Sequence, residues 1–102
     1  MKTFRTKGFT AKDQFIATTA TPIKAVKGNV ITVAEVEVSE NSDGVLVGYI
    51  KDEDGVIYAT ISSTIIDQLI PLSEMLEDTT VDVKVISKVS SSDMEYFMLE
   101  LQ

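Results

Sequence analysis

The chain has 102 residues, and 44% of them are hydrophobic. This length and composition fit one domain with a single core and exclude a multidomain protein. The absence of Cys and His removes disulfides, thiolate nucleophiles and the commonest general base and metal ligand. We therefore expect a binding protein and not an enzyme, without a metal or another cofactor.

Charge is unevenly distributed along the chain. Nine Lys and Arg stand against 16 Asp and Glu, which gives a formal net charge of −7. Residues 1–28 contain six cations and one acid, Asp13, whereas residues 29–102 contain three Lys and 15 acids. A protein polarised in this way can bind a polyphosphate through its basic end. The alternative is that the acidic part keeps the protein soluble and the cations are ordinary surface residues.

The first 12 residues mix Thr, Lys, Gly and isolated Phe without periodicity. This predicts a basic N-terminal arm, residues 1–12, followed by a single domain, residues 13–102. No apolar run typical of a secretory signal follows the first cations, and no stretch is long and apolar enough to span a membrane. The sequence thus favours a cytoplasmic protein with no membrane partner.

Strands are expected along most of the chain, because 33 of the 102 residues are β-branched Val, Ile or Thr. The first predicted strand covers residues 14–21. After the turn Lys27-Gly28-Asn29, the second covers residues 30–38, where Val alternates with Glu. The turn at residues 41–44 then leads into the next strand.

The clearest hairpin joins residues 45–51 to residues 56–61 through Asp52-Glu53-Asp54-Gly55. If these four residues form the turn, Tyr49 lies opposite Tyr58 on one face. The other face is more apolar and is expected to be buried. It collects Leu46, Gly48, Ile50, Ile57, Ala59 and Ile61. This register places both tyrosines on the solvent face.

A helix is predicted after residue 61. Residues 62–64 are candidate N-caps, and apolar residues recur at helical spacing from Ile65 to Leu76. Pro71 lies inside this pattern and is expected to kink the helix or divide it into two short ones. Alternating residues at 81–85 and 96–101 predict two further strands that form a terminal hairpin.

This order of elements predicts a mainly β fold. It is the order of a five-stranded barrel of the oligonucleotide-binding (OB) type, in which one helix lies between strands three and four. Closure of the barrel would hide the edges of the Val-rich strands. A small β-sandwich, or an open sheet covered by one helix, is the competing arrangement.

Four segments carry a resemblance to a known family. They are Gly-Phe-Thr-Ala-Lys-Asp-Gln-Phe at residues 8–15, Lys-Ala-Val-Lys-Gly-Asn at 24–29, Tyr-Ala-Thr-Ile-Ser at 58–62 and Val-Lys-Val-Ile-Ser at 83–87. In layout the chain resembles small OB-fold single-stranded DNA-binding proteins of bacteriophages and mobile elements. The resemblance implies binding of single-stranded DNA without sequence specificity, in replication or recombination, in the host cell cytoplasm. The chain differs from bacterial-type members in having no Trp and no long acidic tail.

A single-strand binder needs cations for the backbone and aromatic rings for the bases. An OB fold binds its ligand across strands two and three, between the loops that join strands one to two and four to five. The candidate nucleic-acid-binding residues are Arg5, Lys7, Lys12, Lys24, Lys27, Tyr49, Lys51, Tyr58 and Lys88. In the alternative interpretation, the two tyrosines only stabilise their hairpin.

The phenylalanines divide into two groups. Phe15 and Phe97 are expected in the core. Phe4 and Phe9 lie among the N-terminal cations and are expected to contact either DNA or a neighbouring subunit. A homo-oligomer is therefore conceivable through the N-terminal arm or through strand edges.

Two functions from other classes remain open. The first is a protein-interaction module or inhibitor whose acidic face mimics DNA and binds a basic partner. That face would carry Glu35, Glu37, Glu40, Asp43, Asp52, Glu53 and Asp54. The second is a structural subunit that assembles through exposed strand edges.

Overall fold

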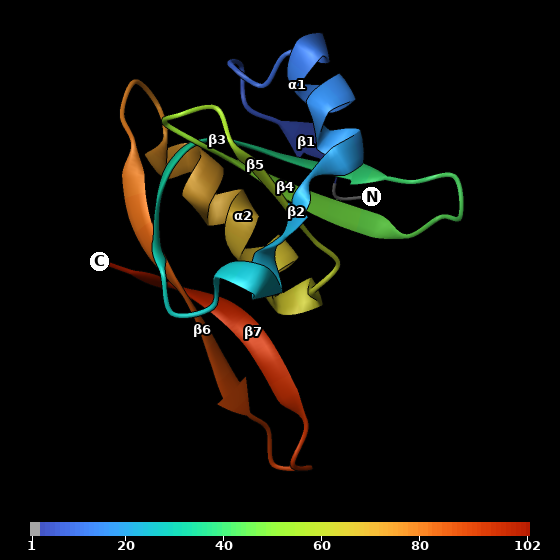
Figure 1. Cartoon of the computed structure of the whole chain (residues 1–102), viewed down its shortest axis with the longest axis vertical. Helices are drawn as coiled ribbons and strands as arrows, with labels where there is room; N and C mark the ends of the chain where they lie inside the picture. Colours follow the sequence, from blue (N-terminus) through green and yellow to red (C-terminus); the bar gives the residue numbers. More distant parts are fainter. Residues whose placement is uncertain (1–2) are drawn as a thin grey trace.

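A computed structural model describes residues 3–102 of the chain (Figure 1). Its N-terminal part contains two very short strands and three short helical segments. They are β1 (Phe4–Arg5), α1 (Ala11–Ile16), the 3-10 turn η1 (Ala17–Thr19), β2 (Thr21–Pro22) and the 3-10 turn η2 (Ile23–Val26). The remainder contains most of the sheet and one long helix. Its elements are β3 (Val30–Glu40), β4 (Leu46–Asp52), β5 (Ile57–Thr60), α2 (Ser63–Met75), β6 (Val81–Val89) and β7 (Glu95–Leu101).

The seven strands form one curled sheet in the order β2-β5-β4-β3-β6-β7, and β1 pairs with β3 beside this path. The long strand β3 pairs with β6 through residues 30–33 and with β4 through residues 33–40, with an irregularity between Val33 and Glu35. This irregularity bends β3, and the sheet curls into a half-barrel around α2 (Figure 1). Within residues 3–102 no pairing joins β7 to β5 or β2, so the sheet stays open. The prediction of a mainly β fold is confirmed, with seven strands in an open sheet.

Three hairpins end in the same five-residue turn, at residues 41–45, 52–56 and 90–94. In each, the backbone N–H of the first residue donates to the carbonyl of the fifth at 2.9 Å. The side-chain oxygen of the first residue accepts the N–H of the fifth. The fourth residue has a positive φ in every case, 80° at Gly44, 88° at Gly55 and 61° at Asp93. The first two turns thus use glycine where the left-handed backbone favours it.

This turn corrects the predicted register of the β4-β5 hairpin. Only residues 53–55 lie between the closing pair Asp52 and Val56, one residue fewer than expected. Tyr49 therefore lies opposite Ala59, and Tyr58 lies opposite Ile50. Because side chains alternate between the two faces of a strand, this shift of one residue separates the tyrosines. They lie on opposite faces of the sheet, and the prediction of an adjacent pair on the solvent face was wrong.

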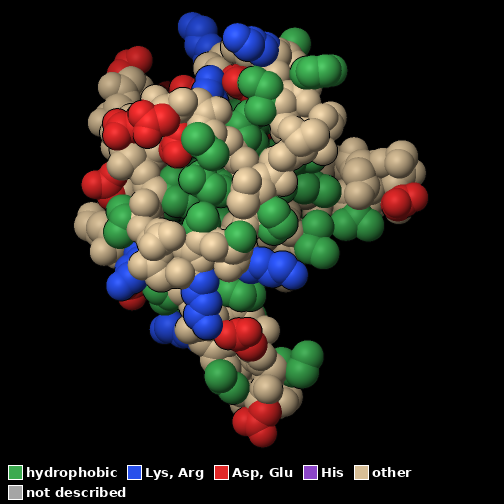
Figure 2. Space-filling model, viewed as in Figure 1, with side chains coloured by type: hydrophobic (Ala, Val, Ile, Leu, Met, Phe, Trp, Pro, Cys, Tyr) green, Lys and Arg blue, Asp and Glu red, His purple; other side chains and the backbone are tan. Residues whose placement is uncertain are grey.

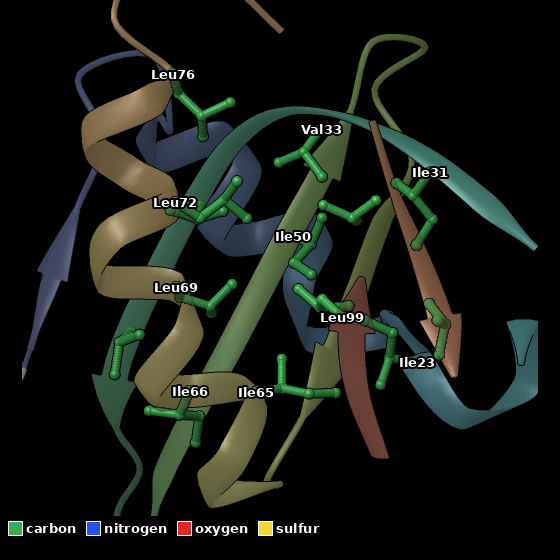
Figure 3. Packing of buried hydrophobic residues seen from close by; sticks show 14 residues of the cluster. Ile23, Ile31, Val33, Ile50, Ile65, Ile66, Leu69, Leu72, Leu76 and Leu99 are labelled. Atoms are coloured by element: carbon green, nitrogen blue, oxygen red, sulfur yellow. The ribbon is translucent and has the colours of Figure 1, made fainter. Parts of the chain in front are cut away.

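The main core lies between α2 and the inner face of the half-barrel (Figure 3). The side chain of Ser62 caps the helix by accepting the N–H of Ile65. One face of α2 is buried, and it carries Ile65, Ile66, Leu69, Leu72 and Leu76. The predicted helix is confirmed, and Pro71 lies inside one helix and does not divide it.

Gly48 on β4 allows α2 to lie close to the sheet. A Cβ atom at this position would be 2.9 Å from Cδ1 of Leu69 and 3.1 Å from Cγ1 of Ile66. Both distances are shorter than an ordinary van der Waals contact. A larger residue at position 48 would therefore push the helix away from β4.

Side chains of α2 and of its N-cap residue Ser62 also contact the backbone of β7. Gln68 Nε2 donates to the carbonyl of Leu99 at 2.8 Å, and Gln68 Oε1 accepts the N–H of the same residue at 2.8 Å. The hydroxyl of Ser62 donates to the carbonyl of Phe97 at 3.3 Å. These bonds hold β7 against the first turns of the helix.

The segment predicted as the first strand is helical. Residues 11–16 form α1, and η1 follows directly. Thr10 and Asp13 make a capping box, because the Thr10 hydroxyl accepts the N–H of Asp13 and the Asp13 carboxylate accepts the N–H of Thr10. These bonds satisfy donors at the helix start and outweigh the strand preference of the Ile and Thr residues that follow. The prediction of a strand over residues 14–21 was wrong.

Candidate nucleic-acid interface

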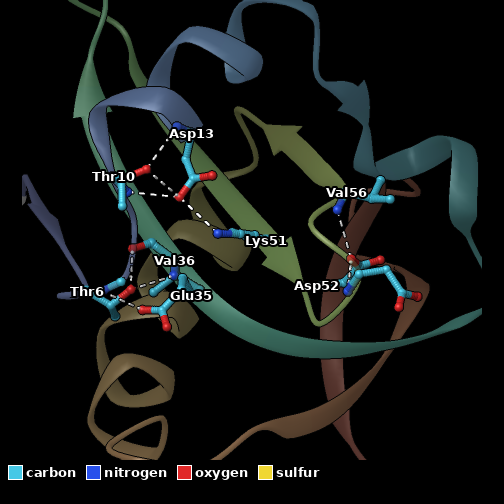
Figure 4. Close-up of polar contacts among 10 residues, drawn as sticks. Thr6, Thr10, Asp13, Glu35, Val36, Lys51, Asp52 and Val56 are labelled. Atoms are coloured by element: carbon cyan, nitrogen blue, oxygen red, sulfur yellow. Dashed lines mark hydrogen bonds and ion pairs between the residues drawn. The ribbon is translucent and has the colours of Figure 1, made fainter.

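The N-terminal segment, residues 4–20, pairs with β3 through β1 and then lies on the outer face of the sheet over β3 and β4 (Figures 1 and 4). Polar contacts attach it to the strands. The Gln14 amide donates to Glu37 Oε1 at 2.7 Å, and Arg5 Nε lies 3.7 Å from the same oxygen. The N–H of Gly8 donates to Glu35 Oε1 at 3.0 Å. Two carboxylates of β3 therefore have their partners in this segment.

An ion pair fixes α1 to β4. The Lys51 ammonium donates to Asp13 Oδ2 at 3.0 Å, in a position where Asp13 is only 5% exposed (Figure 4). Burial raises the pKa of Asp13, but the hydrogen bonds from the Thr10 N–H and from Lys51 outweigh burial and bring the pKa below its usual value. Lys51 is thus neutralised by a partner in its own chain and does not lie free on a ligand surface.

A small apolar cluster lies beneath the same segment, apart from the main core. Phe9, Ala17 and Ile57 are buried in it, and Tyr49 packs against it. The rings of Phe9 and Tyr49 are 6.4 Å apart between centroids, with an angle of 36° between their planes. Burial, followed by the negative charge of Glu37, raises the pKa of Tyr49. Phe9 is 1% exposed, so the expectation that it contacts DNA or another subunit was wrong.

Tyr58 lies on the inner side of β5, where it packs against the main core. Burial, together with the charges of Asp52 and Asp54, raises the pKa of its hydroxyl. Phe4 and Phe97 also pack against the core in half-buried positions, which confirms the expectation for Phe97. The two tyrosines therefore do not share a surface on which bases could stack.

A groove of about 550 Å³ opens where the sheet fails to close. One wall comes from the β2-η2 segment and the end of β5, the other from the start of β7, and the first turn of α2 lies between them. The lining is mostly apolar and consists of Pro22, Ile23, Lys24, Val47, Ala59, Thr60, Ile61, Ser62, Ser63, Thr64, Glu95, Tyr96 and Phe97. Tyr96 and Phe97 thus bring two aromatic side chains to the groove.

Three of the predicted cations lie at or beside this groove. Lys24 lines it directly. Lys27 is 3.1 Å from Glu95, and this hydrogen bond, with help from Ser87, lowers the pKa of Glu95. Lys88 is exposed and lies opposite Tyr96 in the β6-β7 ladder. In Figure 2, Lys and Arg side chains accordingly gather around the middle of the molecule, near η2 and the base of this hairpin.

The other predicted cations lie elsewhere. Arg5 is bound to Glu37, as described above. Lys7 lines a second groove between the N-terminal residues and the end of α2, together with Glu77 and Asp78. Lys12 is exposed on α1. Lys24 therefore lines the groove, Lys27 and Lys88 lie beside its residues Glu95 and Tyr96, and the remaining candidates lie on other surfaces.

Two aromatic residues were missed as site candidates. Tyr96 was placed in the last predicted strand, and its position opposite Lys88 follows from the alternation of that hairpin. Phe15 was expected in the core, but it is 78% exposed on α1. The spacing of Thr10 and Asp13 is the sequence signal for this helix, and recognising it would have removed Phe15 from the expected strand.

Among residues 3–102, no group of three or more acidic side chains is arranged to hold a metal ion. In the same part of the chain, every helix is too short or too polar to cross a membrane. No family model, no curated protein and no solved structure matches this chain.

Proposed function

We propose that the protein binds single-stranded DNA, without sequence specificity, along the groove at the open edge of the sheet. The observation that carries this proposal is an apolar groove lined by Tyr96 and Lys24, with Lys88 opposite Tyr96 in the β6-β7 ladder. Lys24 and Lys88 would contact phosphates, and Tyr96 would stack on a base, whereas Lys27 is already paired with Glu95. A ligand with alternating phosphates and flat bases fits this mixture of charge and aromatic surface.

The strand order supports an OB-like fold for this function. We propose that β3 to β7 with α2 correspond to the five strands and the helix of such a fold. The first of these strands, β3, pairs with both the second and the fourth, and α2 follows the third. The groove occupies the place where pairing between β5 and β7 would close a barrel.

The outer face of β4 and β5, which an OB fold would offer to its ligand, is less suitable here. The N-terminal segment covers Tyr49 and Lys51 on that face. Glu35 and Glu37 lie beneath the same segment and would repel phosphates if it moved away. These contacts favour the open edge of the sheet over the outer face as the path of the DNA.

Local charge also supports the open edge. No Asp or Glu occurs between Asp13 and Glu35, and this stretch contains Lys24 and Lys27; the one acid in the groove lining, Glu95, is paired with Lys27. Two phosphate contacts on a single strand predict a slope of about −1.4 in a plot of log K against log salt concentration. Binding is therefore expected to weaken clearly with salt, although the chain as a whole is acidic.

The test is fluorescence anisotropy of a labelled oligo-dT titrated with the protein at low and moderate salt. Lys24→Ala and Lys88→Ala should each weaken binding and reduce the salt slope by roughly 0.7. Lys7→Ala removes the same charge from the second groove and should leave both quantities unchanged. Tyr96→Ala should weaken binding roughly fivefold or more, whereas Tyr96→Phe keeps the ring and the affinity.

Competition experiments complete the test. Duplex DNA in excess should not displace the labelled single strand. Absence of binding at low salt, in a protein shown to be folded by its thermal transition, would overturn the proposal. That result would direct the search toward a basic protein partner of the acidic residues. Equal loss of affinity in Lys7→Ala would instead show that the attraction is general and that the groove is not the site.

A further inference from the structure

Phe15 is the most exposed of the large hydrophobic side chains in the part of the chain that the structure describes. Its side chain is 78% exposed, and Ile16 beside it is 38% exposed. Lys12 lies one helical turn before Phe15 and is also exposed, so the two side chains are neighbours on the helix surface. An aromatic ring and a cation therefore lie together on a surface outside the groove.

The helix that carries Phe15 is held firmly. Asp13, between Lys12 and Phe15 in the sequence, is nearly buried and bound to both Thr10 and Lys51. Phe9 and Ala17 anchor the two ends of the segment in the small apolar cluster. The ring of Phe15 is thus carried by a helix whose backbone is already fixed. Ligand binding therefore loses little further conformational entropy in this helix.

The same surface leads toward the groove. In Figure 1, α1, η1, β2 and η2 run in sequence from one end of the molecule to its middle, where Lys24 lines the groove. The residues between Phe15 and Lys24 include the exposed Thr18, Thr19 and Thr21 and no acid. The carboxylate of Asp13, the only acid in residues 1–28, is paired with Lys51. This path therefore has a cation at each end, Lys12 and Lys24, and no charged residue between Phe15 and Lys24.

We infer that Phe15 and Lys12 form a second contact point for the same nucleic-acid strand. One base stacks on the ring of Phe15, and Lys12 contacts a neighbouring phosphate, while the groove holds another part of the strand. This inference rests on the proposed function and adds a site on α1 to it. The cations at the two ends of this path, Lys12 and Lys24, complement a phosphate backbone, whereas a second copy of this acidic chain offers no such repeated charge, so a single strand is favoured as the occupant.

The absence of Trp from the chain allows a direct test. Phe15→Trp places a single tryptophan at the proposed stacking point, and a base stacked on its ring quenches its fluorescence. Val45→Trp is the matched control, because Val45 is also exposed, at 43%, but lies in the turn between β3 and β4. Oligo-dT should quench the fluorescence of Phe15→Trp, with the same concentration dependence as the anisotropy, and leave Val45→Trp unchanged.

A second variant measures the contribution to affinity. Phe15→Ala should weaken the binding of oligo-dT by roughly fivefold or more, and Phe15→Tyr should retain it. Because Phe15 is largely exposed, neither change is expected to alter the thermal unfolding transition.

The outcomes separate the inference from the proposed function. If the anisotropy shows binding but Phe15→Trp is not quenched and Phe15→Ala binds normally, the second contact point is wrong and the groove remains. If no oligonucleotide binds, both are wrong. If the fluorescence of Phe15→Trp changes with protein concentration in the absence of DNA, Phe15 lies between copies of the chain, and that result also overturns the inference.

Discussion

The two faces of the sheet are covered in different ways. The inner face packs on α2 through a continuous apolar core that includes Ile50, Ile65 and Leu69. The outer face is covered by the N-terminal segment through ion pairs, hydrogen bonds and a small cluster around Phe9. Salt screens ionic contacts but does not weaken the burial of apolar surface by screening. The comparison indicates that the half-barrel with α2 is the stable unit. The N-terminal segment depends on the half-barrel for its folded structure.

The largest loss of stability is expected from a substitution on the inner face of the sheet. Leu69→Ala removes a side chain with no exposed surface and leaves a cavity beside Gly48, so it should lower the free energy of unfolding by about 3 kcal/mol. Leu101→Ala is the control, because Leu101 is 60% exposed and its truncation should cost less than about 0.5 kcal/mol. Urea unfolding measures both, and similar values for the two variants would contradict the assignment of the core.

A smaller loss of stability is expected from a substitution on the outer face of the sheet. Lys51→Met leaves the nearly buried carboxylate of Asp13 without its cation and should cost about 1–3 kcal/mol. Hydrogen exchange should show faster exchange at residues 11–20, with α2 still protected. Adding Asp13→Asn removes the unpaired charge and should restore part of the protection. Equal loss of protection in α2 would mean that the two layers unfold as one unit.

The same ion pair predicts a dependence on pH. Asp13 has a pKa below its usual value in the folded protein. At pH values between this lowered pKa and the ordinary carboxyl pKa, the folded state therefore binds fewer protons than the unfolded state. Its contribution to stability is therefore present above the ordinary carboxyl pKa and is lost as the pH falls through the lower pKa of Asp13. Asp13→Asn should flatten this part of the stability curve, measured by urea unfolding at a series of acidic pH values. An unchanged curve would assign the acid sensitivity to other carboxylates.

The smallest change in stability, a gain, is expected from a substitution in a turn. Asp93 occupies, with φ 61°, the position that Gly44 and Gly55 occupy in the two equivalent turns. Asp93→Gly relieves the left-handed backbone strain but increases the freedom of the unfolded chain, so the net gain should be only about 0.5 kcal/mol. Thermal unfolding of this variant beside Ser91→Gly, which changes a neighbouring position of the same turn, distinguishes the backbone effect from a general effect of glycine.

Local patterns in the sequence predicted much of the half-barrel but little of the outer layer. Helix α2 follows from its N-cap and its apolar spacing, and the hairpin turns follow from their Asn, Asp and Gly residues. The register between β4 and β5 depends on whether Asp52 belongs to the strand or to the turn, which composition does not decide. That single residue determines the face on which Tyr58 lies.

The candidate site was harder to predict, because its residues come from segments far apart in the chain. Lys24 and Tyr96 line the same groove only because η2 and the start of β7 border the same opening. The partners of Lys51 and Glu37 lie in a segment that was expected to be an arm and a strand. Contacts of this kind depend on tertiary packing, and neither strand propensity nor periodicity contains them.

The two hydrogen bonds between Gln68 and Leu99 have a consequence for association. The edge of an open sheet presents backbone donors and acceptors that can pair with another chain and extend the sheet from molecule to molecule. The Gln68 amide occupies the donor and the acceptor of Leu99 in the same way as an added strand would. A side chain of a helix thus ends the hydrogen-bonded ladder at this point. The half-barrel can remain open here without offering Leu99 as the first residue of a fibril.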